Sequence, residues 1–209
     1  MFTHNLDPVI FSLGFISIRW YSLAYVLGIL IGWWYGKKLI SNKSQLKEKF
    51  NLKHFDDLIT YLVISIIIGG RLGYVAFYNI QYYLSNPIDI FKIWEGGMSF
   101  HGALIGIILG TYIFSILRKI ETLFLLDIIA CVSPIGIFFG RIANFINSEL
   151  YGIETTLPWG VKFIKIDNLY RHPSQLYEAI FEGIILFIIL IYLRSKISIR
   201  IPGLISAIF

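Results

Sequence analysis

The sequence predicts an all-α fold, a polytopic bundle of membrane-spanning helices with its longer loops on the outer side of the membrane. Hydrophobic residues make up 56% of the 209 residues and charged residues only 15%, and the mean hydropathy is +0.71. Soluble domains carry about 25% charged residues, so this composition is typical of a membrane protein. No repeat or linker divides the sequence, and we predict a single membrane-embedded domain over residues 1–209.

Five apolar runs are long enough to cross the hydrocarbon core of a bilayer as helices, which needs about twenty residues. In chain order they are Ser17–Gly36, Leu58–Tyr78, Phe100–Leu117, Leu123–Phe145 and Leu176–Leu193. A sixth run begins at Gly203, so we expect five complete spans and the start of a sixth. Before the first span, the loose alternation of Pro8–Ile18 around Gly14 indicates a small interfacial hairpin.

The distribution of basic residues predicts the orientation of these spans. If the runs alternate across the membrane, eleven lysines and arginines lie on one side, in the loop Lys37–Lys53, the turn Leu117–Glu121 and the segment after Leu193. Five lie on the other side. Because basic loops stay in the cytoplasm, the amino terminus is expected outside. The net charge of +5 then reflects membrane topology and does not indicate a nucleic-acid partner.

Glycines at intervals of four residues predict close packing between spans. They recur at Gly28, Gly32 and Gly36, at Gly102, Gly106 and Gly110, and at Gly136 and Gly140. Small residues at this interval let helix backbones approach closely where no hydrophobic effect drives association. These glycines are therefore assigned to packing.

The segment Gly140–Gly152, with the sequence GRIANFINSELYG, is the strongest candidate for a functional site. Arg141, Asn144 and Asn147 follow one another at intervals of three, so a helix places them on one face. A charge inside a membrane segment costs roughly 2.5–3.5 kcal/mol and normally has a partner or a task. Because a guanidinium can hold phosphate through two parallel hydrogen bonds, Arg141 indicates a phospholipid headgroup site.

Further polar residues lie toward the outer ends of the same spans. Arg71, in the second span, has three candidate partners, namely Asp57, Asp127 or a lipid phosphate. His101 opens the third span, where it would act either as a general base or as an interfacial histidine bonded to a loop. Tyr21, taken alone, is typical of an interfacial aromatic belt.

The segment Arg171–Glu178, with the sequence RHPSQLYE, is typical of a helix start. Pro173 or Ser174 begins the helix, and Glu178 and Glu182 follow four residues apart near its positive end. A helix start can bind an anion, although capping alone accounts for most of the pattern. The four histidines of the chain lack the spacing of metal ligands, and we predict neither a metal nor a cofactor.

Six blocks of this sequence resemble the prolipoprotein diacylglyceryl transferase family. They follow the order of the family at plausible spacing and cover essentially the whole chain. The blocks are Asp7–Phe11, Arg19–Tyr21, Gly69–Tyr74, Trp94–Gly102 (WEGGMSFHG), Gly140–Gly152 and Arg171–Glu178.

The resemblance implies an enzyme of the bacterial inner membrane whose active site faces the outer leaflet. Such an enzyme transfers the diacylglyceryl group of phosphatidylglycerol to the cysteine thiol of a lipobox peptide, the first step of lipoprotein maturation. The implied partners are phosphatidylglycerol, prolipoproteins and membrane lipid.

The resemblance also implies roles for individual residues. Those implied in binding phosphatidylglycerol are Arg141, Gly152 and Arg71. Those implied in catalysis are His101, Tyr21, Asn144 and Glu149. Arg141 would hold the phosphodiester, and His101, or a group that it orients, would help to deprotonate the incoming thiol. Gly152 would permit a turn with close backbone approach.

Two other classes of function are compatible with the residues alone. A small transporter of an anionic lipid or solute could use the same buried arginine, but it would call for discontinuous helices and an inverted repeat, which the sequence lacks. A noncatalytic membrane subunit would not need polar groups gathered on one side. Because family members continue through further spans, one of which bears another functional arginine, we expect these 209 residues to transfer the group poorly.

Overall fold

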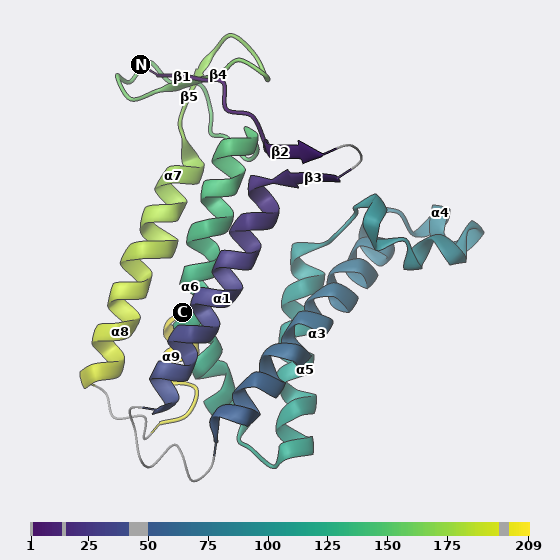
Figure 1. Cartoon of the computed structure of the whole chain (residues 1–209), viewed down its shortest axis with the longest axis vertical. Helices are drawn as coiled ribbons and strands as arrows, with labels where there is room; N and C mark the ends of the chain where they lie inside the picture. The colour runs from purple at the N-terminus through teal and green to yellow at the C-terminus, as the bar shows by residue number, and fades with distance from the viewer. Residues whose placement is uncertain (1, 14–15, 42–49, 197–200) are drawn as a thin grey trace. The chain divides into compact units, whose positions relative to one another are not determined.

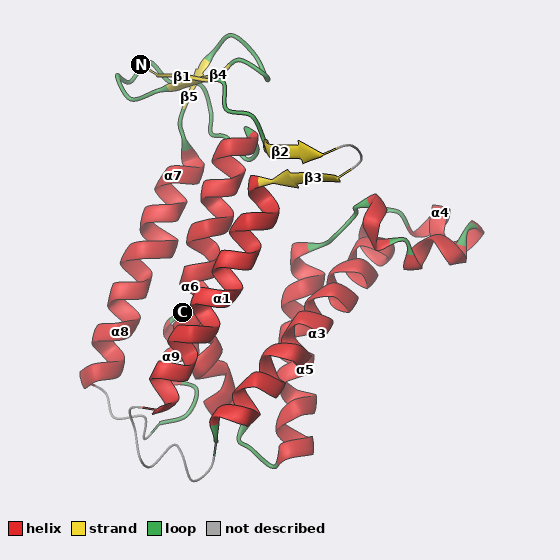
Figure 2. Ribbon diagram, in the orientation of Figure 1, coloured by secondary structure: helices red, strands yellow, loops and turns green. Residues whose placement is uncertain are grey.

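The computed structural model describes residues 2–13, 16–41, 50–196 and 201–209, and most of them are helical (Figures 1 and 2). The contacts divide the chain into two compact units. The first unit comprises Met1–Gly36 and Ile129–Phe209, and the second unit comprises Lys37–Ile128.

Three long helical segments lie side by side in the first unit, and Figure 1 shows them running together. They are α1 (Trp20–Ser41), the later part of α6 (Thr122–Asn147) and a continuous segment built from α7 (Ser174–Glu178), the π-helical stretch η3 (Ala179–Ile185) and α8 (Leu186–Lys196). A short helix, α9 (Leu204–Ile208), follows. The rings of Tyr35 and Phe187 join α1 to α8 with centroids 5.0 Å apart.

Short strands cover the end of the first unit where α6 finishes and α7 begins (Figure 2). The strand β1 (Phe2–His4) pairs in parallel with β4 (Val161–Phe163), which pairs antiparallel with β5 (Tyr170–Arg171). The hairpin predicted at Pro8–Ile18 is confirmed by β2 (Val9–Leu13) and β3 (Ile16–Arg19), although residues 14–15 lie outside the described part. The three-stranded sheet was not predicted, because β1 is far from its partner β4 in the sequence.

Two antiparallel helices form the second unit, joined by a segment of short helices. The elements are α3 (Leu52–Tyr78), α4 (Ile80–Ser85), the 3-10 turns η1 (Pro87–Phe91) and η2 (Ile93–Glu95), and α5 (Phe100–Arg118). The side chain of Asn51 accepts from the main-chain N–H of His54 and caps α3, so this helix begins six residues before the predicted start at Leu58. Ser99 caps α5 in the same way, accepting from Gly102 N at 3.2 Å.

Glycines let α3 and α5 touch backbone to backbone. A Cβ built on Gly73 would lie 2.7 Å from the Cα of Gly102, and one on Gly69 would lie 2.9 Å from the Cα of Gly106. The predicted packing role of the glycines in the third span is therefore confirmed. In the first unit a Cβ on Gly28 would lie 3.3 Å from the Cα of Gly136, which also confirms a close approach.

The packing prediction is wrong at Gly140. Among the described residues, a Cβ on Gly140 would meet no atom within 4 Å beyond its own helix and neighbours. The four-residue spacing matches the other pairs, but this position of α6 faces no closely packed backbone. A side chain can be added there without a steric clash.

Four helices of the described residues are long and apolar enough to cross a membrane. They are Leu52–Tyr78, Phe100–Arg118, Thr122–Asn147 and Ser174–Ser195, with mean hydropathies of 1.8 to 2.2. The helix α1 has 22 residues, but it is rich in Trp, Tyr and Gly, which score low on hydropathy scales, and it is not among the four. It begins at Trp20, later than the predicted Ser17, because β3 continues to Arg19.

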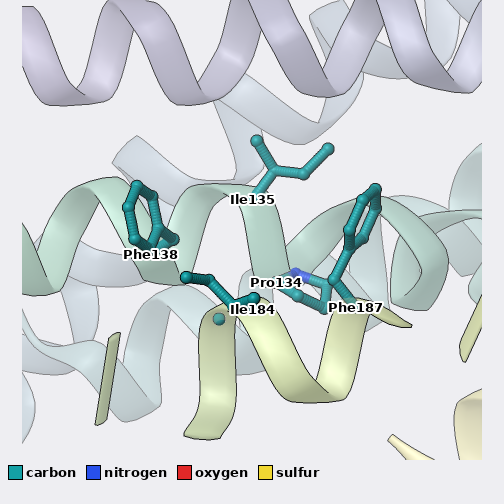
Figure 3. A pocket seen from close by; sticks show the side chains of 6 residues that line it. Pro134, Ile135, Phe138, Ile184 and Phe187 are labelled. Atoms are coloured by element: carbon teal, nitrogen blue, oxygen red, sulfur yellow. The ribbon is translucent and has the colours of Figure 1, made fainter. Parts of the chain in front are cut away.

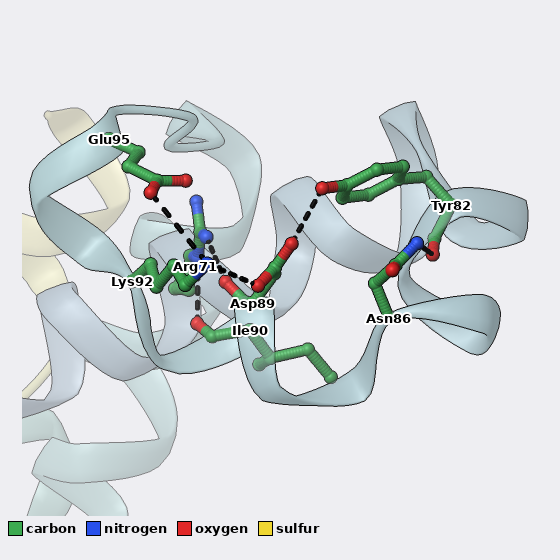
Figure 4. Close-up of polar contacts among 7 residues, drawn as sticks. All are labelled: Arg71, Tyr82, Asn86, Asp89, Ile90, Lys92 and Glu95. Carbon is green, nitrogen blue, oxygen red and sulfur yellow. Dashed lines mark hydrogen bonds and ion pairs between the residues drawn. The ribbon is translucent and has the colours of Figure 1, made fainter.

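Arg71 holds the segment between α3 and α5 in place. Its Nε donates to the carbonyl of Ile90 at 2.9 Å, and its Nη2 donates to that of Asp89 at 2.6 Å (Figure 4). Its Nη1 donates to the carbonyls of Gly96 at 2.5 Å and Gly97 at 3.2 Å. The side chain is only 4% exposed. Four of its five N–H bonds are thus committed to main-chain oxygens.

The carboxylate of Asp89 makes further contacts within the segment that Arg71 holds. Asp89 accepts from the hydroxyl of Tyr82 at 2.6 Å and forms an ion pair with Lys92 at 2.6 Å (Figure 4). Hydrogen bonding from Lys92, and then from Tyr82, lowers the pKa of Asp89. Of the three candidate partners of Arg71, Asp57 is excluded, because Asp57 instead binds Arg118 at 2.6 Å.

Replacing Arg71 with alanine is expected to loosen the segment Asn86–Gly97 while α3 and α5 stay packed. Four main-chain carbonyls lose their donor, and each one that stays buried and unsatisfied costs about 1–3 kcal/mol of local stability. Hydrogen–deuterium exchange of residues 86–97 should accelerate in Arg71→Ala. It should change little in Lys92→Ala, which removes a partly exposed ion pair from the same segment. Equal exchange in Arg71→Ala and the parent would contradict the anchoring role.

Candidate active site around Arg141 and Glu149

The polar cluster of the first unit forms where α6 ends. Asn144 lies in the last turn of the helix, and the chain then turns back through Ser148 and Leu150, whose φ angles are 60° and 52°. These two left-handed residues bring Glu149 beneath the helix end, where its N–H donates to the carbonyl of Asn144 at 2.9 Å. Non-glycine residues adopt this conformation at a cost of about 1–2 kcal/mol each, so other contacts must hold the turn.

Three residues predicted for the site meet in one hydrogen-bond network. The Asn144 amide Nδ2 donates to the hydroxyl of Tyr21 at 3.1 Å and to Glu149 Oε2 at 3.2 Å. The amide of Asn147 reaches the other carboxylate oxygen of Glu149 at 3.5 Å. Asn144 is 6% exposed. The first turn of α1 and the end of α6 are thereby joined through side chains.

The start of α7 supports the same turn from the other side. Gln175 is fully buried, and its Nε2 donates to the main-chain carbonyl of Glu149 at 2.6 Å. Ser174 Oγ donates to the carbonyl of Leu150 at 2.7 Å. The predicted helix start at Pro173 or Ser174 is confirmed, since α7 begins at Ser174. The sequence did not indicate that this start supports Glu149.

Arg141 is held by two carboxylates of the segment α7–η3. Its Nε lies 2.7 Å from Glu178 Oε2, and its Nη2 lies 3.5 Å from Glu182 Oε2. The three side chains are 28%, 32% and 50% exposed, so the cluster is partly open. The spacing of four between the glutamates, which the sequence interpretation attributed to the helix dipole, places both on the face toward Arg141.

Gly152 lies where the chain leaving α6 meets the chain entering α7. Its N–H donates to the carbonyl of His172 at 2.9 Å, and the N–H of His172 donates to the carbonyl of Ile153 at 2.9 Å. A Cβ on Gly152 would lie 2.8 Å from the Cβ of His172 and 2.9 Å from its carbonyl oxygen. The expected close backbone approach is present at this glycine.

A buried histidine also contacts this region, and the sequence analysis missed it. His4, on β1, is fully buried, and its Nδ1 lies 3.2 Å from the hydroxyl oxygen of Ser148. Burial lowers the pKa of His4, and the positive charge of Lys165 lowers it further. The ring therefore stays neutral at physiological pH. A lone histidine in a short amino-terminal segment carries no sequence signal for this contact.

The other predicted site residues belong to the second unit. His101 is exposed in the first turn of α5, and its ring centroid lies 5.7 Å from that of Phe100. Arg71 is buried beneath the segment that it anchors. Its contacts fit a structural role better than phosphate binding, because four of its donors are already bonded.

An apolar groove adjoins the Arg141 cluster along α6 and η3. It has a volume of about 150 Å³ and is lined by Pro134, Ile135, Phe138, Gly183, Ile184 and Phe187 (Figure 3). A Cβ on Gly183 would lie 2.8 Å from the Cβ of Phe138, so this glycine lets the two segments approach. Phe138 precedes Arg141 by three residues and lies on the same side of the helix. Arg141 thus follows the apolar lining of the groove by about one helical turn.

Comparison with known proteins agrees with these features. Residues 8–209 match the family model for prolipoprotein diacylglyceryl transferase. The chain is 53% identical over 206 residues to the phosphatidylglycerol–prolipoprotein diacylglyceryl transferase of Rickettsia felis, covering 98% of this chain and 78% of the relative. It is 57% identical over 192 residues to the protein of the same name from Rickettsia typhi. That match covers 92% of this chain and 73% of the relative. It is 54% identical over 206 residues to the protein of the same name from Rickettsia rickettsii strain Sheila Smith. That match covers 98% of this chain and 78% of the relative.

Proposed function

The chain belongs to the prolipoprotein diacylglyceryl transferase family, and we propose that it catalyses the first step of bacterial lipoprotein maturation. The diacylglyceryl group of phosphatidylglycerol passes to the lipobox cysteine of a prolipoprotein. The cysteine thiolate attacks the glyceryl carbon that bears the phosphate ester, so a C–S bond forms and a C–O bond breaks. Glycerol phosphate leaves with the electron pair, and the proton of the thiol passes to a base.

The placement of Arg141 is the observation that carries this proposal. A guanidinium bordered by an apolar groove matches a lipid with an anionic headgroup, because the phosphate and an acyl chain require these two surroundings side by side. The contact to Glu182, at 3.5 Å, is the longer of the two ion pairs. An entering phosphodiester would displace Glu182 first and leave Glu178 to orient the guanidinium.

Negative charge grows on the departing phosphate during transfer, and Arg141 would stabilise it. The network of Tyr21, Asn144 and Glu149 would position the headgroup and the peptide. Its carboxylate accepts hydrogen bonds from two amides, which fixes the orientation of an otherwise mobile side chain.

One assay tests the function directly. The purified chain is incubated with phosphatidylglycerol and a peptide carrying a lipobox cysteine, and the products are analysed by mass spectrometry. A thioether-linked diacylglyceryl peptide together with glycerol phosphate supports the enzyme. The same peptide with serine in place of cysteine should remain unmodified. Movement of phosphatidylglycerol across a vesicle membrane without any adduct would overturn the proposal in favour of a transporter.

His101→Gln is expected to slow transfer without weakening the binding of phosphatidylglycerol. If the imidazole, or a group that it orients, accepts the thiol proton, the variant deprotonates the incoming cysteine more slowly. The effect should be about 10²-fold on kcat, a typical contribution of general base catalysis. The measurement is kcat against pH for both proteins. A ratio near one across the whole range would exclude this role.

The four apolar helices and the family imply a multi-pass protein of the inner membrane. We propose α1 as a further span, because its 22 residues reach about 33 Å at 1.5 Å per residue. Together with the four helices, α1 would give five spans. The charge distribution supports an external amino terminus and a site that opens toward the outer leaflet.

Cysteine labelling is expected to confirm this orientation. The chain has a single cysteine, Cys131, which is buried and can be replaced by serine. In that background Ser85→Cys, on the outer segment, should react with a membrane-impermeant maleimide in intact spheroplasts. Glu121→Cys, in the turn between α5 and α6, should react only after the membrane is opened. The reverse pattern would overturn the proposed orientation.

A further inference from the structure

The amino-terminal strand makes its most specific contact with the turn that carries Glu149. His4 lies on β1, opposite Phe163 of β4 in the sheet register. Its ring packs against Phe145 with centroids 4.8 Å apart and against Phe163 with centroids 5.1 Å apart. His4 Nδ1 lies 3.2 Å from Ser148 Oγ, and both residues are almost completely buried.

Ser148 is the residue at which this contact matters for the site. Its φ of 60° reverses the chain immediately before Glu149. Its main-chain N–H already donates to the carbonyl of Phe145 at 3.0 Å, so the hydrogen bond to His4 involves the side chain alone. A left-handed serine is unfavourable by itself and persists only when its surroundings fix it.

The other ring nitrogen of His4 is buried without a hydrogen-bond partner among the described residues. A buried polar atom in this condition is destabilising, so an apolar ring would satisfy the packing at least as well as histidine. Packing alone therefore does not account for a histidine at this position. The hydrogen bond to Ser148 does account for it.

We propose that His4 is a positioning residue for Glu149, acting through its hydrogen bond to Ser148. The inference rests on the proposed transfer reaction for its catalytic consequence, but its structural part can be measured separately. The amino-terminal strand thus fixes the turn from one side, and Gln175 and Ser174 fix it from the other. The carboxylate then stays within reach of Asn144 and Asn147.

The decisive variant is His4→Phe, which keeps an aromatic ring between Phe145 and Phe163 but removes both ring nitrogens. Thermal stability should stay the same or rise, because the unpartnered nitrogen is lost, while amide exchange at residues 148–152 accelerates about tenfold. In the transfer assay kcat should fall by about tenfold with the KM for phosphatidylglycerol within about threefold. A residue with a purely structural role would change activity only in step with stability.

Three further variants test whether the effect comes from the hydrogen bond between His4 and Ser148. Ser148→Ala removes the other partner and should reproduce the effect, and combining it with His4→Phe should add little, because both lose the same hydrogen bond. His4→Asn, whose amide can occupy the place of Nδ1, should restore part of kcat. Thr3→Val, on the same strand with an exposed side chain, is the control and should match the parent.

If amide exchange at residues 148–152 is unchanged in both His4→Phe and Ser148→Ala, the hydrogen bond between His4 and Ser148 does not hold the turn. If exchange is faster but kcat is normal, the hydrogen bond does not position Glu149 for transfer. If the parent transfers no diacylglyceryl group, the proposed function fails. Faster exchange in the variants would then still support the structural part of the inference.

Discussion

Arg141→Ala is expected to abolish most binding of phosphatidylglycerol and to lower the rate of transfer by about 10²–10³-fold, the usual cost of removing a group that stabilises developing negative charge. The guanidinium is the positive charge of the polar cluster, where Glu178 and Glu182 hold it in place. Without it, the two carboxylates would face the phosphate directly and repel it. Binding is measured with fluorescent phosphatidylglycerol in nanodiscs of zwitterionic lipid, and transfer by the peptide assay.

Arg141→Lys separates the geometry of the guanidinium from its charge. Lysine keeps the positive charge but cannot make two parallel hydrogen bonds, so it should recover only part of the lipid affinity. Arg118→Ala is the matched control, because it also removes an arginine that is ion-paired to a carboxylate, here at 2.6 Å from Asp57. It should leave binding unchanged. Parental affinity in both Arg141 variants would contradict the phosphate role.

The polar cluster could be predicted from the sequence because its parts are local. Arg141, Asn144 and Glu149 lie within nine residues, and helical spacing brings Asn144 to the helix end where Glu149 folds back. Tyr21 has no local link to them, and its place in the network came from family resemblance. Close packing of the glycines on α5 was predictable for the same local reason, since one spacing determines one helix face.

The contacts that the sequence did not reveal all join distant segments. Glu178 has the composition and position of a helix-capping acid, and only the packing of α7 beside α6 turns it toward Arg141. His4 reaches Ser148 across 144 residues. Arg71 was expected to meet a carboxylate or a phosphate, and it instead binds main-chain carbonyls, which carry no side-chain signature. Long-range hydrogen bonds to the main chain cannot be inferred from residue types.

Gly152→Ala is expected to displace the turn between Gly152 and His172 and thereby misalign Arg141 and Glu149. The added methyl would lie 2.8 Å from the Cβ of His172 and 2.9 Å from its carbonyl oxygen, so the chain segments at Gly152 and His172 must move apart. Overpacking of this kind costs about 1–3 kcal/mol. The hydrogen bonds that join the chain after α6 to the start of α7 would weaken with it.

The effect on transfer should exceed the effect on stability, because a shift of about 1 Å in a positioning element can cost about 10²-fold in rate. Gly140→Ala is the matched control, since the same methyl group there meets no atom within 4 Å among the described residues. That helical substitution should leave transfer intact and raise stability by about 0.5–1 kcal/mol, the usual gain of alanine over glycine. Thermal unfolding and the peptide assay measure both variants. If Gly152→Ala transfers at the parental rate, the junction with His172 does not align the site, and Arg141 and Glu149 must be held by the ion pairs and the α6 turn alone.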